Sequence, residues 1–201
     1  MDINPNKYYH IYNRSNNYET VFKSIENYDY FIRKYRKYLA FHFDTIAYCL
    51  MPTHFHFLVF VKDIDRKDKP EDISEIEFID SIMLYIKKKT GLLLSSYAKA
   101  INKRYNRHGS LFKGHTKALE VDDESYLLSL ISYIHQNPIR AGLVHSLDEW
   151  YFSSYREYID QDRSDFISKE IVYSYFRTID EFKKHSEILL DNINEKYWIK
   201  I

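Results

Sequence analysis

The chain has 201 residues, of which 45% are hydrophobic and 29% charged, a composition typical of one globular domain and too apolar for an intrinsically disordered chain. Its 29 basic and 29 acidic residues give a formal net charge of zero, which excludes a global attraction to a polyanion, so a nucleic-acid surface would require local separation of charge. The single cysteine excludes an internal disulfide and a cysteine-rich zinc site. No signal-peptide pattern or membrane-length apolar run occurs, so we expect a soluble cytoplasmic protein without a membrane partner.

The first third of the chain predicts the start of an antiparallel α+β sheet. Residues 8–14 alternate as a strand does, and residues 21–41 repeat apolar side chains every three or four positions, which indicates a helix. Residues 44–50 predict a second strand, and a short turn at 51–53 leads into a third. A strand, a helix and a hairpin in this order predict an antiparallel sheet with helices packed on one face.

The third strand, residues 54–61, contains two histidines separated by one phenylalanine. Side chains alternate between the faces of a strand, so His54 and His56 share one face, about 7 Å apart, and Phe55 takes the other. The apolar run that follows indicates a buried strand, in which imidazoles need hydrogen-bond partners or a ligand. The spacing alone is compatible with hydrogen-bonded core histidines and with a metal site that has further ligands elsewhere.

Charge is strongly segregated in the next part of the chain. Residues 62–80 are rich in acidic side chains and contain a proline, which predicts a solvated connector. Residues 81–119 contain no acidic side chain and carry nine lysines and arginines, with a helix predicted over 92–105. A solvated helix face would normally mix both signs of charge, so we favour a phosphate-binding groove made of basic side chains and tyrosines.

A strand and a helix complete the predicted domain. Residues 115–121 predict the strand, and an acidic start at 122–124 followed by apolar residues at helical spacing predicts a helix that ends at Pro138. Tyr133 and Asn137 are four positions apart and therefore share a face of this helix. Residues 159–201 predict a charged, helical tail without recognisable chemistry.

Several segments, in collinear order, resemble a known family. They are YNRS, YCLMPTHFHFLV, NKRYNRHGSLFKG, YIHQNPIRAGLV and the pattern W-x-x-SSY, and the resemblance covers residues 8–158. It is to the IS200-like single-tyrosine HUH transposases, and within them most closely to the REP-associated tyrosine transposase branch. Two positions depart from the family pattern: Thr53 stands where asparagine is frequent, and His115 stands where arginine is usual.

The resemblance implies a ferredoxin-like sheet and an enzyme that cleaves and rejoins DNA strands. It implies that His54, His56 and Asn137 hold Mg²⁺ or Mn²⁺, and that Tyr133 is the nucleophile that becomes joined to the 5′ phosphate. The substrate would be single-stranded DNA associated with a hairpin, and the enzyme a monomer or a homodimer. Residues 1–158 would form the nuclease domain, with 62–91 inserted after the histidine strand and 159–201 as an extension.

We expect the DNA backbone to contact basic side chains from several parts of this domain. They are Arg14, Lys99, Lys103, Arg104, Arg107, Lys113, Lys117 and Arg140. Three other hypotheses stay open. The chain could be a metallonuclease that uses the same histidines without a covalent intermediate, a DNA-binding module of the same fold with reduced catalysis, or a protein in which both histidines are purely structural.

Overall fold

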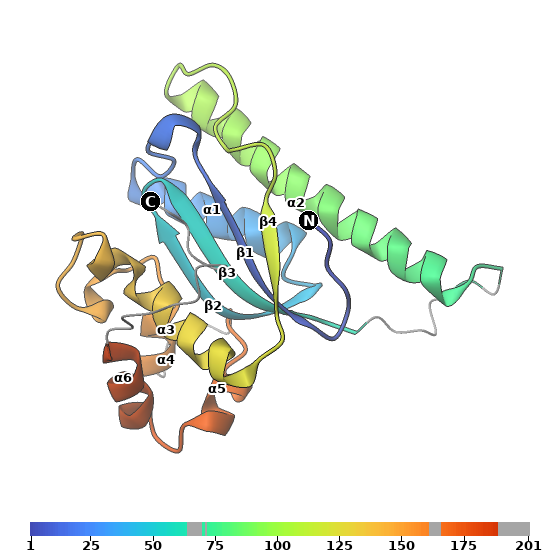
Figure 1. The fold of residues 1–201 in the computed structure, drawn as a ribbon. Helices are drawn as coiled ribbons and strands as arrows, with labels where there is room; N and C mark the ends of the chain where they lie inside the picture. Colours follow the sequence, from blue (N-terminus) through green and yellow to red (C-terminus); the bar gives the residue numbers. More distant parts are fainter. Residues whose placement is uncertain (64–69, 71, 161–165, 189–201) are drawn as a thin grey trace.

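Four strands form one antiparallel sheet, in the order β2-β3-β1-β4, in a computed structural model of the chain (Figure 1). The strands are β1 (Tyr8–Arg14), β2 (Phe43–Met51), β3 (His54–Val61) and β4 (Lys117–Val121), and the helices that connect them are α1 (Ile25–Tyr38) and α2 (Glu75–Arg104). The structure describes residues 1–63, 70, 72–160 and 166–188. The succession β1-α1-β2-β3-α2-β4 with this strand order confirms the predicted α+β fold with a ferredoxin-like antiparallel sheet.

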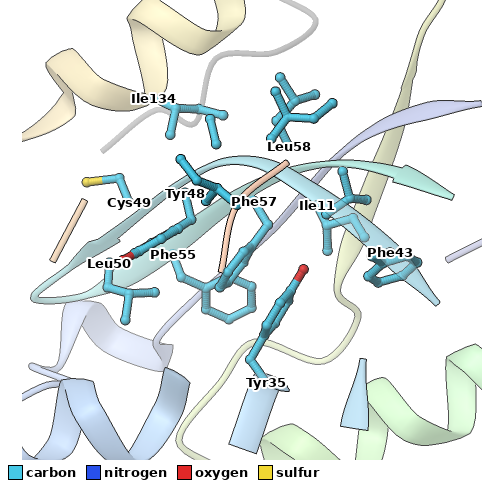
Figure 2. Packing of buried hydrophobic residues seen from close by; sticks show 14 of the residues in the cluster. Ile11, Tyr35, Phe43, Tyr48, Cys49, Leu50, Phe55, Phe57, Leu58 and Ile134 are labelled. Atoms are coloured by element: carbon cyan, nitrogen blue, oxygen red, sulfur yellow. The ribbon is translucent and has the colours of Figure 1, made fainter. Parts of the chain in front are cut away.

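One face of the sheet packs against α1 through a largely aromatic contact. Phe55 and Phe57 of β3 point to this face, as does Tyr35 from the helix below (Figure 2). Tyr35 stacks on Phe57 with ring centroids 4.1 Å apart and 5° between the planes, and Phe31 lies 5.1 Å from Phe55. Large rings bury much apolar area, so a substantial part of the aromatic excess in the sequence serves this core. Helix α2 packs beside α1 in the same layer.

The opposite face is partly covered by α3 (Glu124–Arg140), which contacts β2, β3 and β4. Figure 2 shows Ile134 of this helix on the side of the sheet away from Tyr35. The prediction of helices on one face therefore describes α1 and α2, whereas α3 adds a second helical layer. The physical reason is that Leu58 of β3, whose side chain points to this face, is apolar and needs cover as much as Phe57 does.

The segment after α3 supports that helix. It contains the short helices η3 (Leu147–Glu149), α4 (Tyr155–Ile159), α5 (Glu170–Tyr175) and α6 (Ile179–Glu187). Helix α6 packs on α3, and the Gln136 side-chain amide of α3 donates hydrogen bonds of 2.8 and 2.7 Å to the carbonyl oxygens of Ser186 and Ile188. The described residues of the predicted tail, 159–160 and 166–188, are thus partly helical, and α6 packs against α3. Residues 161–165 and 189–201 lie outside the described residues.

Helix α2 begins much earlier than the sequence pattern predicted. The helix starts at Glu75, and Ser74 caps it: the Ser74 hydroxyl accepts from the Glu77 N–H and the Glu77 carboxylate accepts from the Ser74 N–H. This reciprocal capping box is a sequence signal for a helix start, and it explains why the last acidic residues of the predicted connector are helical. Residues 64–69 and 71 of that connector lie outside the described residues. Despite the length of α2, no helix in the described ranges is both long and apolar enough to cross a bilayer.

Helix α3 continues through Pro138 to Arg140, so the prediction that Pro138 ends it was wrong. Proline lacks the N–H that would bond to the carbonyl of Ile134. The Asn137 side-chain amide nitrogen lies 3.5 Å from that carbonyl oxygen, and 2.8 Å from the carbonyl oxygen one residue earlier. A polar side chain thus supplies a donor where the backbone has lost one, and the helix holds for one more turn.

A glycine ends the helix. Gly142 has a φ of +68°, and two backbone hydrogen bonds of 2.9 Å close the last turn, from Gly142 N–H to the Ile139 carbonyl and from Leu143 N–H to the Pro138 carbonyl. This is the Schellman pattern, in which the residue after the cap adopts a left-handed conformation that glycine tolerates best. The exact end of α3 therefore depends on Gly142.

Replacing Gly142 by alanine should destabilise the protein by about 1 kcal/mol, because an L residue is strained at this φ. Gly91 is the matched control: it lies exposed inside α2, and an added Cβ would meet no atom within 4 Å. Gly91→Ala should stabilise by about 0.5–1 kcal/mol through helix propensity. Urea denaturation of both variants measures the difference, and a loss of stability of the same size in both would contradict the assigned cap.

Candidate active site

Two histidines of β3 lie side by side beneath α3. His54 and His56 are both buried, and their ring centroids are 5.1 Å apart. They point to the face that α3 covers, because the intervening Phe55 packs against α1 on the other face. The alternation of the strand thus brings both imidazoles into one buried region.

The Nδ1 atoms of both rings are held by neighbouring side chains. His56 Nδ1 lies 2.8 Å from Nε2 of His10 on β1, and His54 Nδ1 lies 3.0 Å from the hydroxyl oxygen of Thr53. The Nε2 atoms of His54 and His56 are buried and have no hydrogen-bond partner among the residues that the structure describes. A buried polar atom without a partner is costly, so these two nitrogens are the atoms most suited to receive a ligand.

The histidines are neutral near pH 7. Burial, followed by the charge of Arg14, lowers the pKa of His54 to about 4. Burial, followed by interactions with His10 and His54, lowers the pKa of His56 well below its usual range, and burial lowers the pKa of His10 to about 3. The neutral imidazole is the form that coordinates a metal ion or accepts a hydrogen bond through its remaining nitrogen.

Helix α3 brings Tyr133 to the histidines of the same chain, and Asn137 follows one turn later on the same face of the helix. The Tyr133 ring stands edge-on to His56, with centroids 5.9 Å apart and 88° between the planes, and it is 3% exposed. The guanidinium carbon of Arg140 lies 5.9 Å from the Tyr133 ring centroid. Because the amide nitrogen of Asn137 donates to the Tyr133 carbonyl at 2.8 Å, the amide oxygen is the end of that side chain with which it can bind a ligand.

The donor set bears on whether a divalent ion fits here. Within the described ranges no group of three or more His, Cys, Asp or Glu side chains could hold a metal ion. The histidine Nε2 atoms and the Asn137 amide oxygen nevertheless offer two nitrogens and one neutral oxygen, and both nitrogens are orphaned and buried. Such a set suits Mg²⁺ or Mn²⁺ only if water or phosphate oxygens complete the coordination.

The basic residues predicted to contact DNA fall into two groups, apart from Arg107, which lies in the loop after α2. The first group is on the histidine face, the face of the sheet to which His54 and His56 point. Arg14 lies directly opposite His54 in the β1–β3 register, and Lys117 lies opposite Tyr12 in the β1–β4 register. Arg140 of α3 is on this face too, beside Tyr133. The backbone of Lys113 is bonded to that of Arg14, at 2.8 Å.

The second group is on α2, in the layer behind the sheet. Lys99 and Lys103 are exposed there, and Arg104 lies 3.8 Å from Glu26 of α1, with both side chains more than half exposed. A surface pair of this kind contributes little to stability and leaves the charge accessible.

Arg107 is engaged within the protein. Its guanidinium makes a two-pronged contact with Glu19, at 2.5 and 2.9 Å, and its other N–H groups donate to Asn102 Oδ1, Gly109 O and Ser110 O at 2.9–3.1 Å. All five donors are thus used to hold the loop that follows α2, where Gly109 has a φ of +84°. The structure shows this loop-holding role for Arg107, and its contact with DNA stays a prediction.

Three residues of this region were missed by the sequence reasoning. His10 is hydrogen-bonded edge to edge with His56, with 12° between the ring planes, Tyr12 lies beside both, and Thr53 orients His54. The alternation of residues 8–14 does put His10 and Tyr12 on one face. Which residue of β3 they meet depends on the strand register, which a local pattern does not contain.

No protein-family model and no curated protein sequence matches the chain. The fold of the chain is similar to a solved structure of a REP-associated tyrosine transposase bound to a REP hairpin. The TM-score is 0.53 and the sequence identity 15%, and the alignment covers 84% of this chain and 87% of that one. At this identity the likeness shows the fold, and it supports the fold family expected from the sequence without distinguishing a branch within it.

Lowering the pH from about 7.5 to about 5.5 should destabilise the protein. His10, His54, His56 and His135 all have folded-state pKa values lowered by burial below the unfolded value of about 6.5, so the unfolded state binds protons that the folded state excludes. Their contribution is therefore complete above about pH 6.5 and is lost as the pH falls, by about 1 kcal/mol for each histidine over this interval.

Urea denaturation at both pH values measures this loss of free energy of unfolding. A His10→Phe variant should show a smaller difference between the two pH values, because one of the titrating groups is gone. Equal stability of the unmodified protein at both values would contradict the neutral, proton-excluding state of these rings.

Proposed function

We propose that this chain is a metal-dependent enzyme that cleaves and rejoins single-stranded DNA next to a hairpin, with Tyr133 as the nucleophile. The observation that carries the proposal is the juxtaposition of two orphaned, buried histidine nitrogens with a tyrosine whose ring stands 5.9 Å from that of His56. The likeness in fold to a transposase bound to a DNA hairpin supports it.

His54 and His56, through Nε2, and Asn137, through its amide oxygen, would hold Mg²⁺ or Mn²⁺. When bound there, the ion would polarise a phosphoryl oxygen of the scissile phosphodiester. His10 and Thr53 keep the two imidazoles in place, because each is within hydrogen-bond distance of one Nδ1.

In the proposed reaction Tyr133 releases its phenolic proton to solvent, and its oxygen attacks phosphorus and forms a bond to the 5′ phosphate. The bond from phosphorus to the 3′ oxygen breaks, and this oxygen takes a proton and leaves as a 3′ hydroxyl. The phosphotyrosine retains a phosphodiester bond, so attack by a 3′ hydroxyl rejoins a strand without an external energy source. A phenol with an ordinary pKa of about 10 is a weak nucleophile at neutral pH, so the reaction would require activation of Tyr133 by the bound ion or by a base.

Burial of the nucleophile favours a second candidate, a DNA-binding module with the same fold and reduced catalysis. Tyr133 is only 3% exposed, so a phosphodiester reaches its oxygen only if part of the covering structure moves. Binding alone needs no such movement, because Lys113 and Lys117 are exposed. The two candidates differ in whether a covalent product forms.

Incubation with a 3′-labelled single-stranded oligonucleotide and Mn²⁺ should attach label to the protein, and Tyr133→Phe should abolish this attachment. Tyr126→Phe, near the start of the same helix, is the matched control and should retain it. A denaturing gel resolves the label that moves with the protein, with EDTA as the metal-free control. Cleavage without attached label in both proteins would indicate a metallonuclease that uses water, and binding without cleavage would indicate the binding module.

Replacing His10 by phenylalanine should weaken Mn²⁺ binding by about 10- to 100-fold. Two neutral imidazoles share one hydrogen bond here, and only when His56 Nδ1 carries the proton does His56 Nε2 keep the lone pair that a ligand needs. Phenylalanine removes the acceptor that selects this tautomer, whereas glutamine restores an acceptor and should recover part of the affinity.

Titration of free Mn²⁺ by electron paramagnetic resonance, without DNA, measures this affinity directly. Tyr12→Phe is the control on the same strand, because it keeps the ring beside His56 and leaves the His10 hydrogen bond intact. An unchanged Mn²⁺ affinity of a folded His10→Phe variant would show that His10 does not position His56.

A further inference from the structure

A short turn directly after β1 holds an exposed tyrosine in an unusual backbone conformation. Within η1 (Asn16–Tyr18), Asn17 has a φ of +54° and Tyr18 a φ of +55°. Asparagine tolerates the left-handed region, but a bulky aromatic residue rarely adopts it. The Tyr18 side chain is also 60% exposed, so burial of its ring does not offset the strain.

The surrounding structure fixes this turn from both sides. Ser15 N–H donates to the Thr53 carbonyl at 2.8 Å, and Asn16 N–H donates to the Leu111 carbonyl at 3.0 Å. The Asn16 side-chain amide adds a 3.0 Å bond to the Phe112 carbonyl. The two residues before the strained pair are therefore anchored to two other segments, one of which immediately precedes His54. Strain that the surroundings impose is concentrated at functional sites, so Tyr18 calls for a functional explanation.

Tyr18 lies beside a cation of the histidine face. The guanidinium carbon of Arg14 is 5.0 Å from the Tyr18 ring centroid, and its Nη1 donates to the Tyr18 hydroxyl at 3.3 Å. Arg14 lies opposite His54 in the sheet, and its carbonyl accepts a bond from the N–H of Lys113. An exposed ring, an arginine and a lysine thus adjoin the candidate active site.

We propose that Tyr18 is a stacking platform for one unpaired base of single-stranded DNA whose phosphates contact Arg14 and Lys113. Aromatic rings interleaved with cations are what single-strand binding requires, since every base has a face that stacks on an aromatic ring. This inference rests on DNA being the ligand of the proposed function, and it adds a base-binding position beside the cleavage site. It does not depend on catalysis.

A second exposed tyrosine with an arginine gives a matched control. Tyr151 is 61% exposed, and the guanidinium carbon of Arg156 lies 4.1 Å from its ring centroid. Tyr151 lines a groove with Ile25 and Asp29 on the α1 side of the molecule, away from the histidine face, and it is not among the residues with a positive φ. If any exposed tyrosine–arginine pair bound DNA, both sites would respond alike.

The test is binding of a fluorescently labelled single-stranded oligothymidylate in EDTA, so that no cleavage occurs, over a series of salt concentrations. Tyr18→Ala should weaken binding by about 5- to 100-fold with an unchanged salt slope, because stacking releases no counterions. Tyr18→Phe and Tyr151→Ala should bind like the unmodified protein. Arg14→Gln should flatten the slope by about 0.7, the value for one phosphate contact on a single strand.

Tyr18→Gly separates binding from folding. Glycine adopts a positive φ without strain, so this substitution should raise the melting temperature by about 2–4 °C if all of the strain is relieved. It should weaken DNA binding as much as Tyr18→Ala does, because the ring is gone. A lower melting temperature, or binding by Tyr18→Ala equal to that of the unmodified protein, would overturn the stacking role. If the unmodified protein binds no single strand, both this inference and the proposed function fail. If binding depends on Tyr18 but no covalent product forms, only the proposed chemistry fails.

Discussion

The register between β1 and β3 is the constraint on which the candidate site depends. It sets Tyr12 opposite His56 and His10 opposite Leu58, which brings the His10 and His56 rings within hydrogen-bond distance. A slip of one residue would turn every side chain of β3 to the other face, so the histidines would enter the aromatic core. The stacking of Phe57 on Tyr35 opposes such a slip, because the phenylalanines would then occupy the site. The hydrophobic layer on one face therefore fixes the polar layer on the other.

The part of the site on α3 is held in place by residues that have no proposed role in the reaction. His135 is bonded to the Ser154 hydroxyl at 2.8 Å, and Gln136 is bonded to the backbone at the end of α6. These two contacts tie neighbouring residues of α3 to the segment that follows it, and they restrict the rotation of the helix about its axis. Tyr133 can face His56 only in that rotation. The C-terminal segment thus helps to position α3, although no catalytic or binding motif is recognisable in its sequence.

Sequence periodicity predicted the elements whose signals are local. The strand at residues 8–14 and the histidine strand at 54–61 have the expected bounds, and the shared face of His54 and His56 follows from a period of two. The start of α2 was missed although Ser74 and Glu77 form a recognisable capping box. The end of α3 was wrong because a side chain, Asn137, replaces the donor that Pro138 lacks. Partners far apart in the chain could not be predicted: Glu19 and Arg107 are separated by 88 positions.

The length of α2 has a consequence for how evenly the protein is stabilised. Its 30 residues extend about 45 Å at 1.5 Å per residue, longer than any strand of the sheet, and Figure 1 shows its first turns projecting past the sheet. Ile86 is the first fully buried side chain among those described in this helix. Before it, side chains such as Ile76 and Leu84 are exposed, so these turns depend on the cap and on local hydrogen bonds. Amide hydrogens there should exchange through local opening at low free energy, while those around Tyr97 exchange only when the whole domain unfolds.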